Sequence, residues 1–391
     1  MNDPEPLAVE PVMTENSAEV AMPAEPAAVP GEPGEWHWTL LRMAGAISDE
    51  VISECRDWLA DGDQVEVAAT LSVVAAATRI PVLERDADLI YEELAAAGQS
   101  TDVVAELNEF DDDAELPLAP WLFTPILVDD PDHPDVPALL DLSSDPAEAA
   151  SLDSVDQAAV EAARSEPEIS AVWRAWRYPT GGLAWPLPRR IFVVTTQPGL
   201  ADDELPALTG RLHRAVQDAG ENAPQVELCP AGLLPIYQQA ARANAALLWA
   251  QEPALVLEFA RIFDQVDAEH GPQFDPDRAR IDNVNERLRL LDYLQGAVAV
   301  LPTTATMVDI LDPEHRDVVP LSFRTDGRWI WTDTVSYYLA HYGLAPDGDL
   351  LAHVRSAGSL PPSLSEVGLH RVLAFMERSS HDEPVWAVPD A

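Results

Sequence analysis

The chain has 391 residues, 47% of them hydrophobic, and 68 acidic residues stand against 23 basic ones, which gives a net charge of −45 at pH 7. This length exceeds one ordinary core and predicts two or three folded domains. So negative a field repels phosphate backbones and anionic lipids. We therefore expect a protein partner, and neither nucleic acid nor a membrane surface.

All of the basic residues are arginine, so the lysines of phosphate-loop, kinase and Schiff-base enzymes are excluded. The two cysteines, Cys55 and Cys229, are too few for a disulfide framework or a four-ligand zinc site. The first residues are acidic where a secretory signal needs positive charge, and no apolar stretch has the length of a membrane helix. These features predict a cytoplasmic protein.

Two segments of different character begin the chain. Residues 1–35 are rich in Pro, Ala and Glu and hold eight acids and no base, which predicts a disordered tail. Residues 36–98 predict a small all-α bundle, because apolar residues recur at helical spacing over 36–43, 47–62, 67–78 and 86–97. Ser48 is placed to cap the second of these helices, and Gly62 to end it.

Residues 99–168 hold 19 acids and a single base, Arg164, which predicts an acidic linker. An apolar insert, residues 120–128, interrupts it. We consider two interpretations. The insert docks on a folded part as an edge strand, or it is a partner-binding motif displayed from a flexible tether.

Residues 169–391 predict an α/β domain, with a mixed sheet and helices packed on it. Strands are expected at 190–196, 225–229 and 297–301. Helices are expected at 202–219, 234–251, 253–266, 281–294, 333–343, 350–357 and 365–378. Two further strands, 318–325 and 328–332, flank Asp326-Gly327, a pair that favours a type I′ hairpin turn with positive φ at both positions.

Standard catalytic motifs are missing from the sequence, and we predict no cofactor and no metal ion. The strand that ends at Thr196 and Gln197 leads through a Gly loop to a helix, where α/β folds often hold an anion. However, Asp202, Asp203 and Glu204 follow at once and would repel a phosphate. The acidic stretch 264–277 lacks the calcium-loop spacing and is better interpreted as a solvated turn.

The densest cluster of informative residues surrounds the predicted hairpin and comprises Arg324, Asp326, Trp329, Trp331 and Tyr338. One interpretation is an aromatic core between hairpin and helix, with Arg324 paired to an acid. The other is an aromatic and arginine surface that binds a peptide or a ring-shaped ligand. Together with Thr196 and Gln197, these residues are our candidate binding residues.

Three stretches carry a resemblance. They are FRTDGRWIWTDTVSYYLAHYGLAPDGDLLAHV, VVTTQPGLADDELPALTGRLHRAV and RIFDQVDAEHGPQFDP. The chain resembles a group of uncharacterised actinobacterial proteins, some from type VII secretion neighbourhoods. The resemblance implies a secretion-linked or housekeeping role, and no activity or catalytic residue.

Three hypotheses follow. The first is a cytosolic accessory or interaction protein, linked to type VII secretion, with no enzymatic activity assigned. The second is a ligand-binding or enzymatic α/β module with its site at the strand ends near 195–197 and 303–304. The third is an immunity-type protein that neutralises a basic toxin through its negative field.

Overall fold

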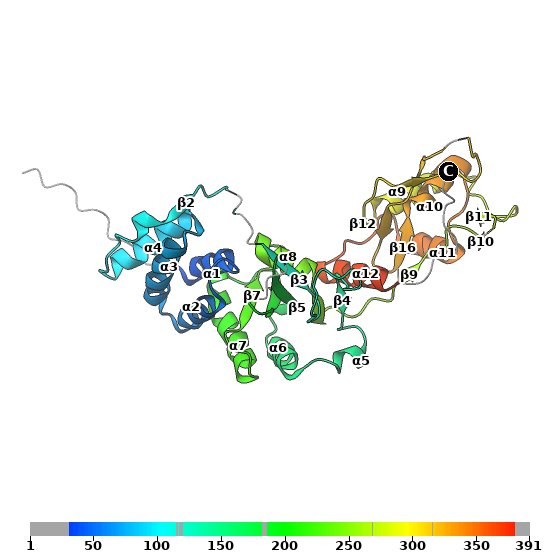
Figure 1. The fold of residues 1–391 in the computed structure, drawn as a ribbon. Coiled ribbons are helices and arrows are strands. Elements are labelled where there is room, and N and C mark those ends of the chain that lie inside the picture. The colour runs from blue at the N-terminus through cyan, green and yellow to red at the C-terminus, as the bar shows by residue number, and fades with distance from the viewer. Residues whose placement is uncertain are drawn as a thin grey trace, which may run out of the picture.

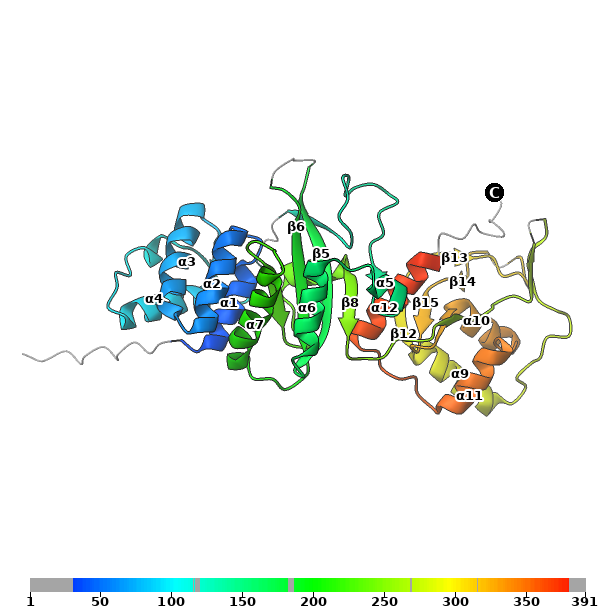
Figure 2. The ribbon, with the colours of Figure 1, turned by 90° about the horizontal axis from the view of Figure 1, so that it is seen from below.

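The computed structural model describes residues 31–114, 116, 120–181, 186–267, 269–314 and 316–379. Over these residues the protein is mixed α/β, with twelve α-helices and several sheets. The molecule is elongated: N-terminal helices lie at one end, a sheet in the middle, and a second, smaller sheet with its helices at the other end (Figures 1 and 2). None of the described helices is both long and apolar enough to cross a bilayer.

The N-terminal helices pack around one apolar core that contains Trp36, Ile52, Leu71 and Ile90. The helices are α1 (Pro33–Met43), α2 (Asp49–Asp61), α3 (Gln64–Thr78) and α4 (Glu84–Ala96), and the short strands β1 (Pro81–Leu83) and β2 (Asn108–Phe110) pair beside a 3₁₀ turn, Val104–Glu106. The Ser48 hydroxyl accepts from Val51 N at the start of α2.

The central sheet has the strand order β4-β8-β5-β6-β7, and β3 pairs with β5. Its strands are β3 (Trp121–Thr124), β4 (Leu140–Asp141), β5 (Ile169–Pro179), β6 (Arg189–Thr196), β7 (Gln225–Cys229) and β8 (Ala246–Ala250). Side chains alternate between the faces, as a strand requires. Phe192 and Val194 pack on one side with α6 (Ser154–Arg164) and α7 (Leu205–Asp218), and Val193 packs on the other with α8 (Ile236–Ala243).

The C-terminal sheet has the order β12-β15-β16-β9. Its strands are β9 (Glu258–Phe259), β12 (Val298–Leu301), β15 (Phe323–Thr325) and β16 (Trp329–Thr332). The helices are α9 (Val284–Gly296), α10 (Asp333–Tyr342), α11 (Gly348–Ala357) and α12 (Glu366–Ser379). Two short helical elements remain, α5 (Pro146–Ala149) and a 3₁₀ turn, Asp202–Glu204. Two short strand pairs also remain. In one, β10 (Gln265–Asp267) pairs with β11 (Gly271–Gln273), and in the other, β13 (Thr306–Met307) pairs with β14 (Val319–Pro320).

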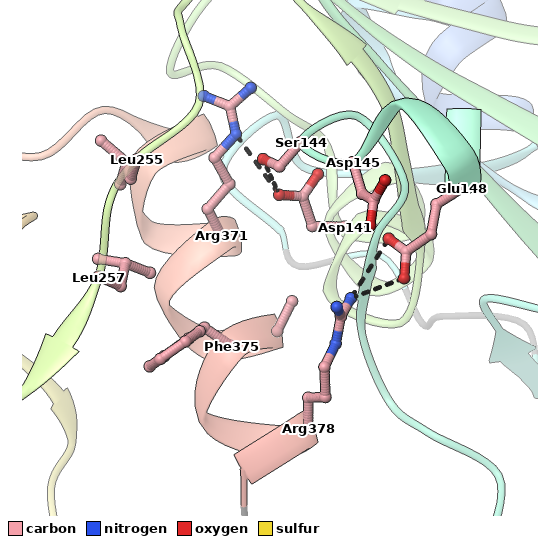
Figure 3. Close-up of a pocket in the computed structure, with 10 residues that line it drawn as sticks. Asp141, Ser144, Asp145, Glu148, Leu255, Leu257, Arg371, Phe375 and Arg378 are labelled. Carbon is pink, nitrogen blue, oxygen red and sulfur yellow. Dashed lines mark hydrogen bonds and ion pairs between the residues drawn. The ribbon is translucent and has the colours of Figure 1, made fainter. Parts of the chain in front are cut away.

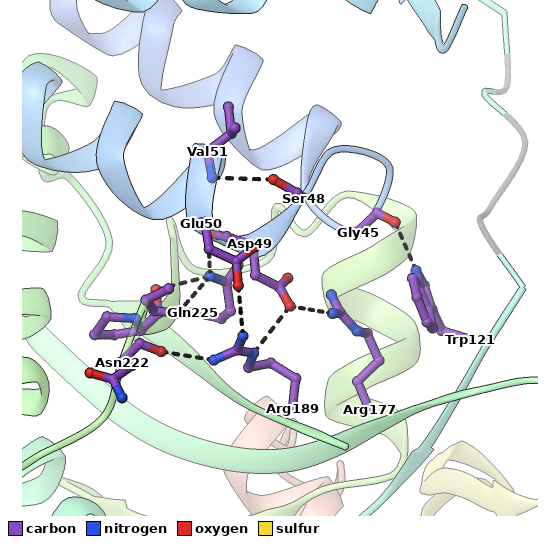
Figure 4. A network of polar contacts seen from close by, with 12 residues as sticks. Gly45, Ser48, Asp49, Glu50, Val51, Trp121, Arg177, Arg189, Asn222 and Gln225 are labelled. Atoms are coloured by element: carbon purple, nitrogen blue, oxygen red, sulfur yellow. Dashed lines mark hydrogen bonds and ion pairs between the residues drawn. The ribbon is translucent and has the colours of Figure 1, made fainter. Parts of the chain in front are cut away.

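Polar contacts join α2 to the central sheet (Figure 4). The Asp49 carboxylate accepts from Arg177 Nη2 at 2.7 Å and from Arg189 Nε at 3.1 Å, and Gln225 Nε2 donates to the Asp49 carbonyl. A second, fully buried pair joins Arg56 Nη2 to Glu227 Oε2 at 2.7 Å. Because buried charges are stable only when paired, these contacts hold the N-terminal helices and the sheet in one relative position.

The predicted acidic linker contributes to the central sheet. The apolar insert forms β3, which pairs antiparallel with β5 from Trp121↔Pro179 to Thr124↔Trp176, so the docking interpretation is confirmed for these residues. Strand β4 and helix α6 also lie within 99–168. Asp156 on α6 is buried against Arg174 and Arg190, which explains how a highly acidic segment packs on the sheet. Of the predicted tail, residues 1–30 lie outside the described residues, and α1 begins at Pro33.

Two predicted helices are wrong. The stretch predicted as helix 234–251 is α8 followed by β8, because the helix ends at Ala243 and the apolar run after it inserts beside β5. The predicted helix 253–266 is extended, and Phe259 in β9 pairs with Ile330 in β16. In both places a tertiary pairing overrides the helical spacing of the apolar residues.

The predicted hairpin exists as β15 and β16, but its turn is not type I′. Gly327 has φ +87°, whereas Asp326 is not among the residues with positive φ. The Asp326 carboxylate accepts from the amides of Arg328 and Trp329 and thereby fixes the turn in another form. The C-terminal half also holds two principal sheets rather than one, since β6 and β12 belong to different sheets.

Candidate binding site along helix α12

Helix α12 lies between the central sheet and the C-terminal sheet in both views of the molecule (Figures 1 and 2). Ser365 precedes it, and the Ser365 hydroxyl accepts from Gly368 N, which satisfies a free amide of the first turn. Val372 and Met376 are buried against the C-terminal sheet, while Val367 packs with residues of the central sheet. The helix therefore contributes side chains to the cores of both sheets, and the hollows beside it are lined by residues from both.

One of these hollows is an apolar groove of about 680 Å³. We call it the α12 groove, and it is lined by Ala138, Leu139, Phe259, Leu301, Phe323, Leu373, Met376, Glu377 and Ser379. Phe259 is 41% exposed and Leu301 46% exposed, so the groove presents large apolar side chains to solvent. Burial of such surface favours association with another apolar group.

A smaller hollow of about 220 Å³ continues the groove and shares Leu139 and Leu373 with it. At its far end Arg242 pairs with Glu366, the first residue of α12. The two hollows thus follow the helix from one end to the other, a length of about 21 Å at 1.5 Å per residue. An extended segment of about six residues spans this distance.

One wall of the groove is polar. The Glu377 carboxylate accepts from Ala138 N at 2.6 Å and from Leu139 N at 2.9 Å. These two amides precede β4, so Glu377 ties the end of α12 to the edge of the central sheet. The groove therefore has a fixed rim with negative charge.

On another side of α12 is a polar pocket of about 180 Å³ (Figure 3). Asp141 accepts from Ser143 and Ser144 and lies 3.7 Å from Arg371 Nε, and Arg378 pairs with Glu148 at 3.2 Å. Arg371 also donates to the Pro253 carbonyl. Because these charges neutralise one another within the pocket, their arrangement indicates that they anchor α12.

The candidate residues around the hairpin form a core. Trp329 and Trp331 are 6% and 1% exposed and pack with α9, α10 and α11. Arg324 pairs with Asp333 at 2.6 Å and donates to the carbonyl groups of Gln295 and Ala297. Tyr338 is also buried, and its hydroxyl accepts from Ile310 N. The side chains that would form an aromatic and arginine surface are thus engaged in packing and ion pairing.

Asp326, like the tryptophans, is engaged in contacts within the fold. Its carboxylate accepts from Tyr293 Oη at 2.8 Å and lies 2.6 Å from His353 Nε2. Burial alone would raise the pKa of Asp326, but hydrogen bonds from Trp329 N and Tyr293 outweigh it and hold the pKa below its ordinary value. The ionised carboxylate therefore fixes the turn, α9 and α11 together.

The strand-end residues do not meet in one site. Thr196 is fully buried, and Gln197 Nε2 donates to Gln251 Oε1 at 2.9 Å. Residues 303–304 follow β12 in the other sheet, so the two strand ends do not share a sheet edge. In the acidic stretch, Asp264 accepts from Asp275 N and pairs with Arg278. Within the part of the chain that the structure describes, no three His, Cys, Asp or Glu side chains are grouped to hold a metal ion.

One arrangement that sequence reasoning missed has the geometry of a catalytic triad. Ser53 Oγ lies 2.9 Å from His213 Nε2, and His213 Nδ1 lies 2.8 Å from Asp57 Oδ1. Ser53 and His213 are 5% and 0% exposed, however, and the Pro224 carbonyl also contacts His213 Nε2 at 3.1 Å. A substrate cannot reach the hydroxyl, and the three residues connect α2 to α7. Ser53 and His213 are 160 positions apart in the sequence, so no local motif joins them.

Neither cysteine is placed as a nucleophile. Both are buried, and burial raises the pKa of Cys55 to about 12 and raises that of Cys229 further. The thiols are therefore protonated at neutral pH, whereas the thiolate is the reactive form.

No protein-family model matches the chain, and neither a curated protein nor a solved structure shows significant similarity to it. The α12 groove is thus identified by its geometry alone. The sequence predicts the helix at 365–378, but Phe259 falls in a stretch wrongly predicted as helical. The pairing of β9 with β16, which brings Phe259 to the groove, has no signal in the local sequence.

Proposed function

We propose that this protein is an accessory protein that binds an apolar segment of a partner protein in the α12 groove. The observation that supports the proposal is the groove itself, which holds exposed aromatic and aliphatic side chains between two cores that fix its shape. Grooves of this kind bind extended or helical segments through alternating apolar anchors. In this proposal the N-terminal helices of 36–98 and the central sheet act as the support of the binding part.

The charge of the chain indicates the chemistry of the partner. A net charge of −45 and Glu377 at the groove favour a segment whose apolar residues are flanked by Lys or Arg. A basic toxin is one partner of this chemistry, as in the immunity hypothesis. On the resemblance to actinobacterial proteins near type VII secretion systems, we place the interaction in the cytosol and next to that secretion pathway.

The proposal is tested with a fluorescent peptide of four apolar residues flanked by lysine pairs, and with a matched peptide flanked by glutamates. Fluorescence anisotropy should show much tighter binding of the lysine peptide than of the glutamate peptide. Leu301→Asp should weaken it at least about tenfold, the loss typical of an interface anchor. Leu360→Asp is the control, because Leu360 is 73% exposed and does not line the groove.

Equal binding by Leu301→Asp and the control variant would place the peptide elsewhere and contradict the proposal. So would the absence of binding to the lysine peptide.

A further inference from the structure

We propose that residues 380–391, which follow α12, occupy the α12 groove when no partner is bound. The inference rests on the proposed function, because it names a competitor for the same groove. Residues 380–391 lie outside the described residues, but their sequence and the place where the chain leaves α12 are both defined.

The exit point is at the groove. Ser379 is the last residue of α12 and lines the groove. Twelve residues follow it, and an extended chain covers about 3.3 Å per residue. Val385 therefore reaches any point within about 20 Å of Ser379, nearly the length of the helix along which the groove runs. Pro384, with its fixed φ, suits the reversal of direction that this path requires.

The segment contains an apolar run that suits the apolar lining of the α12 groove. After Asp382 and Glu383 it contains four consecutive apolar residues, Val385-Trp386-Ala387-Val388. A tryptophan buries about 150–250 Å² when it packs, and Phe259 and Leu301 offer exposed apolar surface to receive it. Occupation of the groove removes both apolar surfaces from water at once.

Electrostatic repulsion weakens the contact of residues 380–391 with the groove, so that a partner segment can displace them. The segment carries Asp382, Glu383 and Asp390, and it would bind beside Glu377 on a strongly acidic protein. Like charges disfavour it, whereas a lysine-flanked segment of the same apolarity is attracted. A short tether supplies an effective concentration of about millimolar, so even a weak contact is largely formed until such a partner arrives.

The test uses the chain of 391 residues and the lysine-flanked peptide. Trp386→Asp should strengthen peptide binding about tenfold, the change expected where the tether's effective concentration of about 1 mM exceeds the dissociation constant of the untethered segment about tenfold. His381→Asp, which adds the same negative charge but leaves the apolar stretch intact, is the control and should change the binding much less. A synthetic peptide of residues 382–390 should bind the Trp386→Asp variant and should lose that binding when Leu301→Asp is added.

The outcomes separate the two proposals. If Leu301→Asp abolishes binding of the lysine peptide but Trp386→Asp does not strengthen it, the tail proposal is overturned and the proposed function stands. If only the 382–390 peptide binds, and Leu301→Asp abolishes that binding, the tail occupies the groove and the proposed function fails. If neither peptide binds, both proposals fall.

Discussion

His37 shows how a single side chain couples the N-terminal helices to the central sheet. It lies on α1, is 3% exposed, and its Nε2 lies 2.8 Å from the Leu228 carbonyl in β7. Burial lowers the pKa of His37 from 6.5 to about 4, although the contact with Leu228 acts in the opposite direction. The imidazole is therefore neutral at pH 7 and donates to the carbonyl.

This environment predicts a loss of stability in acid. Because the unfolded chain takes up a proton near pH 6.5 and the folded chain only near pH 4, protonation favours unfolding between these values. The contribution is fully present above about pH 6.5 and declines as the pH falls, by up to about 3 kcal/mol. His37→Gln keeps a donor for Leu228 and should remove this part of the pH dependence. Urea unfolding of the native chain and of His37→Gln at several pH values measures this. If the free energy of unfolding falls equally with pH in both chains, His37 does not cause the loss of stability.

At the scale of elements, the turn between α1 and α2 determines how the helices lie on α8. Gly45 has φ +77°, and a Cβ there would lie 2.4 Å from Tyr237 Cε2. Tyr237 is itself buried and accepts from Arg177 Nη1, so it cannot give way freely. Gly62, at the end of α2, has φ +87° but no heavy atom within 4 Å of the same position.

The two glycines form a matched pair for a stability measurement. Gly62→Ala should cost about 1–2 kcal/mol, which is the cost of a left-handed conformation for a residue with a Cβ. Gly45→Ala should cost about 1–3 kcal/mol more, because the same strain is joined by a clash with Tyr237. Urea unfolding at neutral pH measures both, and equal losses would show that the turn does not press against α8.

Several elements could be predicted from the sequence because their signals are local. Ser48 and Gly62 bound α2, and the run that ends at Thr196 alternates between two apolar faces in β6. The failures are elements determined by distant partners. The apolar run of β8 is compatible with helix or strand, and only its place beside β5 decides. The α12 groove was missed for the same reason, since β9 and α12 meet only in the folded chain.

At the scale of the whole molecule, buried ion pairs join the N-terminal helices to the central sheet. Arg56 and Glu227 have side chains 2% and 0% exposed, and Gln238 Nε2 donates to the same carboxylate oxygen at 2.8 Å. Removal of Arg56 would leave a buried carboxylate without its cation, a change that typically costs about 3–5 kcal/mol. The free energy of opening is lowered equally for α2 and β7, because the two elements must separate before water reaches Glu227.

We therefore expect α2 and β7 to open as one cooperative unit. In an Arg56→Met variant, hydrogen exchange should show amides of both elements losing protection by the same factor, about 100-fold or more. Amides of β16, whose tryptophans belong to a separate core, should keep their native protection. Arg211→Met is the control, because Arg211 is 48% exposed in its pair with Glu166 and such pairs contribute under about 1 kcal/mol. Loss of protection in α2 alone would mean that the N-terminal helices open without the sheet, and that the buried pair does not unite them.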